Sequence, residues 1–168
     1  MNPIDEPIFD AEFKRSGKQQ VQQADLTDPI RRLLEGQSFC VLCTQGQEQP
    51  YGSLIAFAFS EDLKHLYFTT PTATRKFRLL TSCRRVALVV DSRCQHQTDM
   101  KQVEAVTITA KATHIESGTD PEQGRQLLLK RHPYLGDFLA SESTALFRAD
   151  VVRYFYVTRF QEVTQWIP

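Results

Sequence analysis

The sequence lacks an excess of either charge: its 168 residues carry 20 Lys and Arg against 20 Asp and Glu. Proteins that bind nucleic acid or an anionic membrane usually show a basic excess, so the overall charge indicates neither partner. The sequence also lacks an apolar run near the roughly 20 residues that cross a bilayer. Its first residues, MNPIDEPIFDAEF, lack the basic-then-apolar order of a signal peptide. We therefore predict a cytoplasmic protein with no nucleic-acid or membrane partner.

Cysteine is scarce, and its positions do not predict a metal site. Four cysteines are present. Cys40 and Cys43 are spaced like a metal or redox pair, but in a strand-like run an offset of three sends their side chains to opposite faces. Cys94 and His96 have no neighbouring cluster with ligand spacing. The sequence also contains no Ser-His-Asp spacing, nucleophile elbow or paired carboxylates, so no side-chain nucleophile is predicted.

The length suits one domain with a sizeable core and is too short for two ordinary domains. Residues 1–26 are polar and glutamine-rich, which predicts an N-terminal arm that either wraps a partner subunit or is loose. Residues 27–168 would then form the single domain. A short helix is expected at its start, capped by Thr27 or Asp28, with Pro29 in the first turn and Gly36 at the end.

Strand-like segments dominate the rest of the sequence. Alternating or β-branched apolar residues predict strands at residues 38–44, 51–60, 63–70, 85–91, 103–116, 145–158 and 160–167. Short polar connections between the first three favour antiparallel hairpin neighbours. Helices are predicted at residues 74–82, 120–132 and 133–140. Six or seven strands with one helix inserted mid-sheet and others late predict a mainly β (α+β) fold, a closed Greek-key barrel.

One short region concentrates groups that bind an anion. Residues 66–80, LYFTTPTATRKFRLL, begin as an alternating strand, break at Pro71 into a turn and continue as a helix capped by Thr74. Arg75 and Lys76 occupy its first two positions, where the helix dipole disfavours each cation by about 0.3–1 kcal/mol. A bound anion would reverse that sign, and Arg75 offers a planar fork for phosphate oxygens. The turn adds the hydroxyl donors of Thr69, Thr70, Thr72 and Thr74.

A purely structural interpretation stays open for these residues, because threonine is common in strands and turns and an Arg-Lys pair often lies on a solvated helix start. The local charge favours the phosphate cradle. Residues 74–85 carry no acidic residue and five basic ones, namely Arg75, Lys76, Arg78, Arg84 and Arg85. Such a short basic segment suits a small phosphorylated ligand better than a polyanion.

The order of these motifs resembles the pyridoxamine 5'-phosphate oxidase-like superfamily of flavin-binding split barrels. The resemblance runs from about Pro29 to Trp166 and rests on the segments QPYGSLIAF, LYFTTPTATRK, RVALVVDSR and VTITAKA, in that order. It implies a six-stranded antiparallel split barrel with flanking helices that forms a homodimer. It also implies one flavin mononucleotide (FMN) in each of two grooves between the subunits.

The resemblance further implies which strand residues contact the cofactor. Ser53, Leu54 and Ile55 would lie along the flavin ring, with backbone groups facing its polar edge. Phe68 and Thr69 match the strand that runs under the phosphate.

Other candidate contacts come from the same resemblance. Arg75 and Lys76 match the basic pair that grips the phosphate, in agreement with the cradle of hydroxyls and cations in residues 66–80. The loop DSRCQHQTD resembles a variant in which a polar residue approaches the flavin, which makes Arg93, Gln95 and Gln97 candidates. A plain polar hairpin loop is the alternative for these three residues.

The remaining aromatic and imidazole side chains have weaker assignments. Trp166 lies where family members often bring a C-terminal aromatic toward the partner's flavin, and a core or interface aromatic is at least as well supported. His96, in the candidate flavin loop, is the histidine to test. The other histidines are predicted to be surface or strand residues: His65, His114 and His132.

Two departures from the vitamin oxidases proper change the predicted substrate. Where those enzymes carry an arginine and a lysine, this sequence has Ser53 and Ala58, and its last residues are TQWIP instead of a basic motif. A phosphorylated vitamin would lose charge-assisted hydrogen bonds of roughly 1.5–3 kcal/mol each. We therefore expect an FMN-dependent oxidoreductase with an unknown small-molecule substrate or electron donor. The alternatives are a haem-binding barrel and a flavin-binding dimer without turnover.

Overall fold

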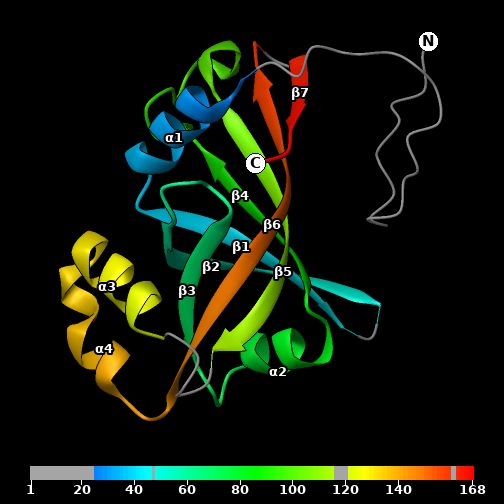
Figure 1. Ribbon diagram of the computed structural model, residues 1–168. Coiled ribbons are helices and arrows are strands. Elements are labelled where there is room, and N and C mark those ends of the chain that lie inside the picture. The colour runs from blue at the N-terminus through cyan, green and yellow to red at the C-terminus, as the bar shows by residue number, and fades with distance from the viewer. Residues whose placement is uncertain (1–24, 47, 116–120, 160–161) are drawn as a thin grey trace.

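Strands form most of the computed structural model, which describes residues 25–46, 48–115, 121–159 and 162–168 (Figure 1). The strands are β1 (Phe39–Gly46), β2 (Gln49–Phe59), β3 (His65–Pro71), β4 (Arg85–Asp91), β5 (Ala105–Ile115), β6 (Thr144–Thr158) and β7 (Glu162–Trp166). Their order is β3-β2-β1-β4-β5-β6-β7, and an antiparallel pairing of β3 with β6 closes the barrel. The predicted six-stranded antiparallel barrel is thus confirmed, with β7 added beside β6. The predicted arm up to residue 24 lies outside the described residues.

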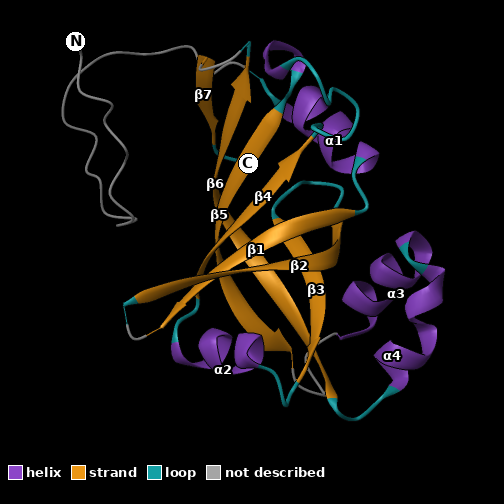
Figure 2. Cartoon of the chain, turned by 180° about the vertical axis from the view of Figure 1, so that it is seen from behind, coloured by secondary structure: helices purple, strands orange, loops and turns teal. Residues whose placement is uncertain are grey.

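Four α-helices flank the barrel in the described parts of the chain: α1 (Thr27–Gly36), α2 (Arg75–Ser82), α3 (Pro121–Arg131) and α4 (Gly136–Ala140). Short 3-10 turns, η1 (Met100–Gln102) and η2 (Pro133–Leu135), accompany them. Figures 1 and 2 show α1 at one end of the barrel, α2 at the other, and α3 and α4 beside β3. The predicted cap of α1 was wrong, because Leu26 holds the N-cap position and makes no side-chain cap.

The barrel interior is the main core. In β5, the side chains of Val106, Ile108, Ala110 and Ala112 face the interior and are all at most 2% exposed. Cys40 is likewise buried while Cys43 is partly exposed, as their odd spacing predicted. A second, smaller cluster lies outside the barrel, where Tyr67 and Ala58 pack with residues of α3 and α4. Two layers of packing therefore hold β3, one on each face.

The last residues of α3 join that helix to the barrel and to α1. The guanidinium of Arg131 lies over two rings of β2, 4.8 Å from the centroid of Phe57 and 5.1 Å from that of Phe59. It also donates hydrogen bonds to three carbonyl oxygens at the end of α1, those of Leu34, Glu35 and Gln37. One side chain therefore serves as the C-terminal cap of a helix far away in sequence.

The surface or strand position predicted for His132 was wrong, whereas His65 and His114 do lie on strands. His132 is 1% exposed, and its Nε2 lies 2.9 Å from the carbonyl oxygen of Phe57. Its Nδ1 lies 3.3 Å from the Tyr134 hydroxyl. Because α3 packs against the barrel, His132, the residue that follows this helix, lies in the interior. No pattern of neighbouring residues in the sequence predicts that packing.

Gly124 allows α3 to pack directly on β3. A Cβ at this position would lie 2.6 Å from Cδ1 of Tyr67, whose side chain is 3% exposed and cannot easily move aside. We expect Gly124→Ala to lower the free energy of unfolding by about 1–3 kcal/mol, because overpacking outweighs a helix-propensity gain of about 1 kcal/mol. Urea denaturation followed by circular dichroism measures the change.

The matched control for that substitution is Gly136→Ala in α4. No atom of the described chain lies within 4 Å of a Cβ built at Gly136, so this variant should be neutral or slightly more stable. Equal destabilisation by the two substitutions would contradict the packing explanation.

Candidate functional site

The barrel is split between β2 and β3. In the described residues these strands are joined by three residue pairs, from Phe57 opposite Phe68 to Phe59 opposite Leu66. The preceding part of β2, from Gln49 onward, pairs with β1, and the end of β3 pairs with β6. The two strands therefore diverge, and α2 begins where β3 leaves the sheet (Figure 2). We call this opening the β2–β3 split.

Thr74 caps α2 as predicted. Its Oγ1 accepts from the amide of Phe77 at 3.2 Å and donates to the carbonyl of Pro71 at 2.8 Å. The hydroxyl of Thr70, a residue only 1% exposed, lies 3.0 Å from it. The hydroxyls of Thr70 and Thr74 thus hold the turn together, and their contact with a phosphate stays a prediction. Thr69 and Thr72 keep hydroxyls that bond to no other described residue.

Arg75 and Lys76 lie at the mouth of the split. The guanidinium of Arg75 is 5.0 Å from the centroid of the Tyr51 ring on β2. Lys76 is half-buried, and loss of hydration lowers its pKa. Neither cation forms an ion pair with a carboxylate of the described residues. Because the Thr74 cap takes only the amide of Phe77, the amides of Arg75 and Lys76 also have no partner within the helix.

Ser53 contributes an unpaired buried hydroxyl on β2. Its Oγ is buried and makes no hydrogen bond. Ser53 follows Tyr51 by two residues, so both side chains lie on the same face of the strand, and Tyr51 already contacts Arg75. An unsatisfied buried polar group costs about 1–3 kcal/mol, so it favours a ligand that supplies a hydrogen bond. The two cations, the two helix-start amides and this hydroxyl are the groups that the split offers to a ligand.

Other strand residues predicted to contact the flavin point elsewhere. Ile55 is 5% exposed and sits opposite Cys40 in the barrel core. Phe68 is fully buried and stacks on Phe147 with ring centroids 5.5 Å apart. Leu54 is 68% exposed and belongs to the outer face. The side chains of Ile55 and Phe68 are therefore core residues, and Leu54 faces away from Ser53, because neighbouring strand residues alternate.

The remaining candidates lie at the opposite end of the barrel from α2. Arg93, Gln95 and Gln97 are exposed on the loop after β4, which lies at the α1 end (Figure 1). Arg93 forms an ion pair of 2.8 Å with Asp91. Trp166 on β7 is partly buried, and its ring centroid lies 5.3 Å from that of Tyr154. A single chain therefore does not bring these four residues to the β2–β3 split.

The outer face of β1, β2 and β4 is apolar, a feature that the sequence interpretation missed. Val41 pairs with Leu54 on one side and with Val89 on the other, and Phe39 at the strand start is 49% exposed. A groove of about 320 Å³ runs along these residues and past Arg93. The sequence does indicate this apolar face, because these strands carry apolar residues at outward as well as inward positions.

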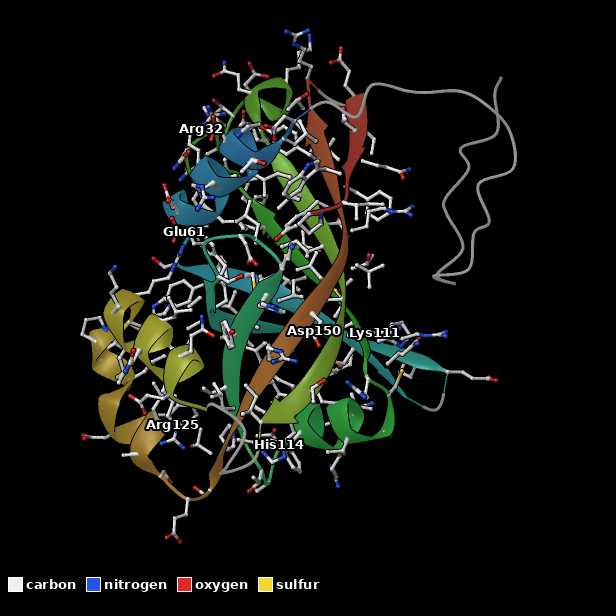
Figure 3. The ribbon with its side chains drawn as sticks, viewed as in Figure 1. Arg32, Glu61, Lys111, His114, Arg125 and Asp150 are labelled. Atoms are coloured by element: carbon white, nitrogen blue, oxygen red, sulfur yellow. The ribbon has the colours of Figure 1, made fainter. Side chains whose placement is uncertain are left out.

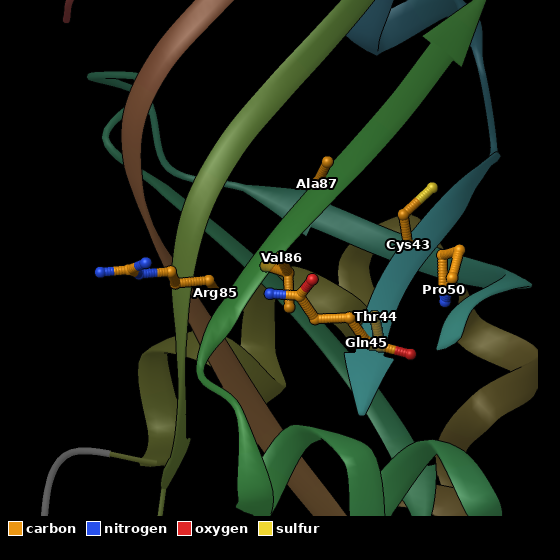
Figure 4. Close-up of a pocket in the computed structure, with 7 residues that line it drawn as sticks. All are labelled: Cys43, Thr44, Gln45, Pro50, Arg85, Val86 and Ala87. Atoms are coloured by element: carbon orange, nitrogen blue, oxygen red, sulfur yellow. The ribbon is translucent and has the colours of Figure 1, made fainter. Parts of the chain in front are cut away.

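A second groove, of about 260 Å³, opens where β1 and β4 diverge (Figure 4). It is lined by Cys43, Thr44, Gln45, Pro50, Arg85, Val86 and Ala87. In Figure 4 the side chain of Arg85 points away from Cys43 and Pro50, which leaves an apolar opening on the outer side. The apolar outer face and its two grooves together form a surface that we call the outer sheet face.

The described residues show neither a metal site nor a membrane-spanning helix. They contain no group of three or more His, Cys, Asp or Glu side chains that could hold a metal ion. Among the described helices, none has the length and apolar character needed to cross a membrane.

The sequence profile of the family described as pyridoxamine 5'-phosphate oxidase matches residues 26–158. The chain belongs to this family. No curated protein matches its sequence. Membership agrees with the split barrel and with the motif order on which the resemblance was based.

Solved structures share the fold of this pyridoxamine 5'-phosphate oxidase family member. A haem-binding protein from Mycobacterium smegmatis has a TM-score of 0.74 and 14% identity, covering 84% of this chain and 57% of that chain. A FAD-binding protein from Mesorhizobium loti has a TM-score of 0.61 and 16% identity, covering 75% and 87%. A Clostridium acetobutylicum protein related to general stress protein 26 has a TM-score of 0.65 and 13% identity, covering 84% and 94%. At these identities the similarity shows the fold alone.

Proposed function

We propose that this family member binds FMN in the β2–β3 split and acts as a flavin-dependent oxidoreductase on a small molecule. The observation that carries the proposal is the pair of cations at the start of α2, Arg75 and Lys76, neither of which has a carboxylate partner in the described residues. A phosphate bound between the two side chains would stabilise their positive charges, which the positive end of the helix dipole otherwise destabilises.

The groups in the split fit FMN. Arg75, Lys76 and their two helix-start amides would hold the phosphate, and the phosphate would offset the cost of desolvating the Lys76 ammonium. The unpaired hydroxyl of Ser53 would bond to a polar edge of the ring system. The flavin supplies the redox chemistry when it is bound, so the protein only needs to bind it, orient it and control access.

The substrate proposed here is not a phosphorylated vitamin. The position that carries a lysine in the vitamin oxidases is Ala58, which is 2% exposed and packs in the cluster with Tyr67 and Leu128. A cation in that cluster would be desolvated without a partner, which is strongly unfavourable. The small-molecule substrate or electron donor is therefore expected to lack a phosphate group.

Haem is the second candidate ligand, because one structural neighbour is a haem-binding protein. The residues of the split favour flavin over haem. None of the described residues that we place there is a histidine, and burial raises the pKa of the nearby Cys40 thiol to about 12, which disfavours the thiolate that would ligate iron.

An absorption spectrum of the purified protein tests the cofactor. We expect flavin bands, either at once or after addition of FMN, and no haem band. Protein that takes up haem and not FMN would overturn the flavin proposal and support the haem alternative. Protein that binds neither would contradict both.

We also propose that the outer sheet face is the interface of a homodimer. A large apolar face on a water-soluble barrel favours a partner, and pairing of two copies would bring Arg93, Gln95, Gln97 and Trp166 of one chain toward the split of the other. We propose a cytoplasmic location as well, which the four unpaired cysteines support.

Leu54→Glu tests the interface. Because Leu54 is 68% exposed in the single chain, the substitution should leave the fold intact. In a dimer it would bury a charge, so we expect the variant to be monomeric at concentrations where the wild type is dimeric. Light scattering after size-exclusion chromatography measures the mass, and Leu129→Glu, at an exposed position on α3, is the control. A dimer in both variants would contradict the proposed interface.

A further inference from the structure

A separate recess lies beside the second half of α2, at the end of β5. Its volume is about 230 Å³, and its lining includes Thr81, Arg84, Thr113, His114 and Phe147. In Figure 3, His114 lies next to α2 at this end of the barrel. The recess shares no residue with the groups that the β2–β3 split offers to a ligand, so a ligand bound in it is independent of the proposed flavin site. We call it the β5-edge recess.

The recess exists because β5 continues beyond the point where β4 begins. The Ala112 amide donates to the carbonyl of Arg84 at 2.7 Å, which is the outermost bond between the two segments. In an antiparallel sheet, every second residue of a strand directs its N–H and C=O toward the same neighbouring strand. His114 therefore directs its amide toward the β4 side, as Ala112 does. The residue that would face it is Ser82, which already belongs to α2. Within the described residues, the His114 amide therefore lies at a part of the β5 edge that β4 does not pair.

Arg84 is held rigidly at this edge. Its Nε donates to the carbonyl of Ala112 at 3.2 Å, and its Nη2 donates to Oγ1 of Thr113. Among the described residues, no further acceptor and no carboxylate pairs with the remaining N–H groups of the planar guanidinium. A fixed guanidinium with free donors is suited to receive a carboxylate.

Aromatic side chains form one wall of the recess. The His114 ring stacks on Phe147 with centroids 5.3 Å apart, and Phe77 meets the same imidazole edge-on at 5.8 Å. No described residue makes a hydrogen bond to the His114 ring nitrogens. Phe147 is 1% exposed and Phe77 does not line the recess, so the His114 ring is the aromatic surface that the recess offers to a planar ligand beside the guanidinium.

The charge around the recess also favours an anion. The segments α2 and β5 contain no acidic residue, and the one acidic residue of β4, Asp91, lies at the far end of that strand from Arg85. Arg78 and Lys111 on the same elements add to the positive potential.

We propose that the β5-edge recess binds the carboxylate of a small aromatic acid. The carboxylate receives hydrogen bonds from Arg84 and the His114 amide, and the ring of the acid lies against the His114 ring. A volume of about 230 Å³ accommodates one ring with its carboxylate.

A titration of the isotope-labelled full chain, followed by amide NMR, tests this site with benzoate as the probe and with benzamide as its uncharged analogue. We expect benzoate to produce a saturable shift at the His114 amide and benzamide to produce none. Benzoate and benzamide acting alike, or inorganic phosphate binding as tightly as benzoate, would overturn the assignment to an aromatic carboxylate. These comparisons use the wild-type protein only.

Arg84→Gln should weaken benzoate binding about tenfold or more, because it removes a charge-assisted hydrogen bond. Arg78→Gln, at an exposed cation on the neighbouring α2, is the matched control and should leave the affinity unchanged. Equal effects of the two substitutions would mean that only the general positive potential attracts the ion, and would overturn the proposed site. The amide spectrum of each variant checks that it is folded.

Discussion

Replacing Arg75 and Lys76 together by alanine is expected to weaken FMN binding by about 100-fold or more and riboflavin binding by less than about threefold. The double substitution removes two charge-assisted hydrogen bonds to the phosphate, worth roughly 1.5–3 kcal/mol each, and riboflavin has no phosphate to lose them. Quenching of flavin fluorescence measures both affinities on the same protein. The contrast between the two ligands separates phosphate binding from any general damage to the split.

The matched control for the double variant is Arg78→Ala. Arg78 is an exposed cation of the same helix, four residues beyond the Thr74 cap. Its substitution therefore tests whether the general positive potential of α2, without direct contact, affects FMN binding. Its substitution should change FMN affinity by less than about threefold, since exposed charges are screened by salt. An equal loss for FMN and riboflavin in the double variant would show that Arg75 and Lys76 support the fold or the dimer and do not bind phosphate.

Replacing Arg131 by methionine is expected to lower the free energy of unfolding by about 2–4 kcal/mol. The substitution keeps an apolar stem over the β2 rings but removes the Arg131 donor from three carbonyls at the end of α1, of which that of Leu34 keeps only the bond of 3.4 Å from the Gln37 amide. It also removes the cation from the faces of Phe57 and Phe59. Urea denaturation at one fixed protein concentration measures the effect, because dimerisation would couple stability to concentration.

Two further variants make the Arg131 prediction specific. Lys130→Met, at the exposed neighbouring position, should change stability by less than about 0.5 kcal/mol. Arg131→Lys should recover only part of the loss, because a compact, strongly hydrated ammonium does not stack on the rings of Phe57 and Phe59 as the planar guanidinium does. If Arg131→Met and Lys130→Met lower the free energy of unfolding equally, Arg131 does not hold α1 to α3.

Local patterns predicted the secondary structure well. β4 spans Arg85–Asp91, the range predicted from its β-branched run, and α2 follows Thr74 as the capping residue predicted. Cys40 and Cys43 point to opposite faces of β1 because an offset of three residues in a strand places side chains on opposite sides. Caps and two-residue alternation depend on neighbours within a few positions, so a sequence carries them directly. The N-cap position of α1 was predicted at Thr27 or Asp28 and lies at Leu26, because an apolar residue gives no capping signal in a sequence.

The candidate site was predicted only in part. The order of motifs indicated the family and placed Arg75 and Lys76 at a helix start, where the structure finds them. The resemblance placed Ser53, Leu54 and Ile55 along the flavin ring with backbone groups facing its polar edge, which stays a prediction, and their side chains alternate between the two faces of β2. Of these, Ser53 alone shows the unpaired buried hydroxyl.

The sequence by itself determined which segments form strands and helices, and that two cations stand at the start of α2. Only the tertiary structure decided that β2 and β3 separate, that β3 closes the barrel on β6, and that His132 is buried. It also decided that Arg131 reaches the carbonyl of Leu34, 97 residues earlier in the chain. Such contacts depend on how all the elements pack at once, and no pattern confined to a few neighbouring residues contains that information.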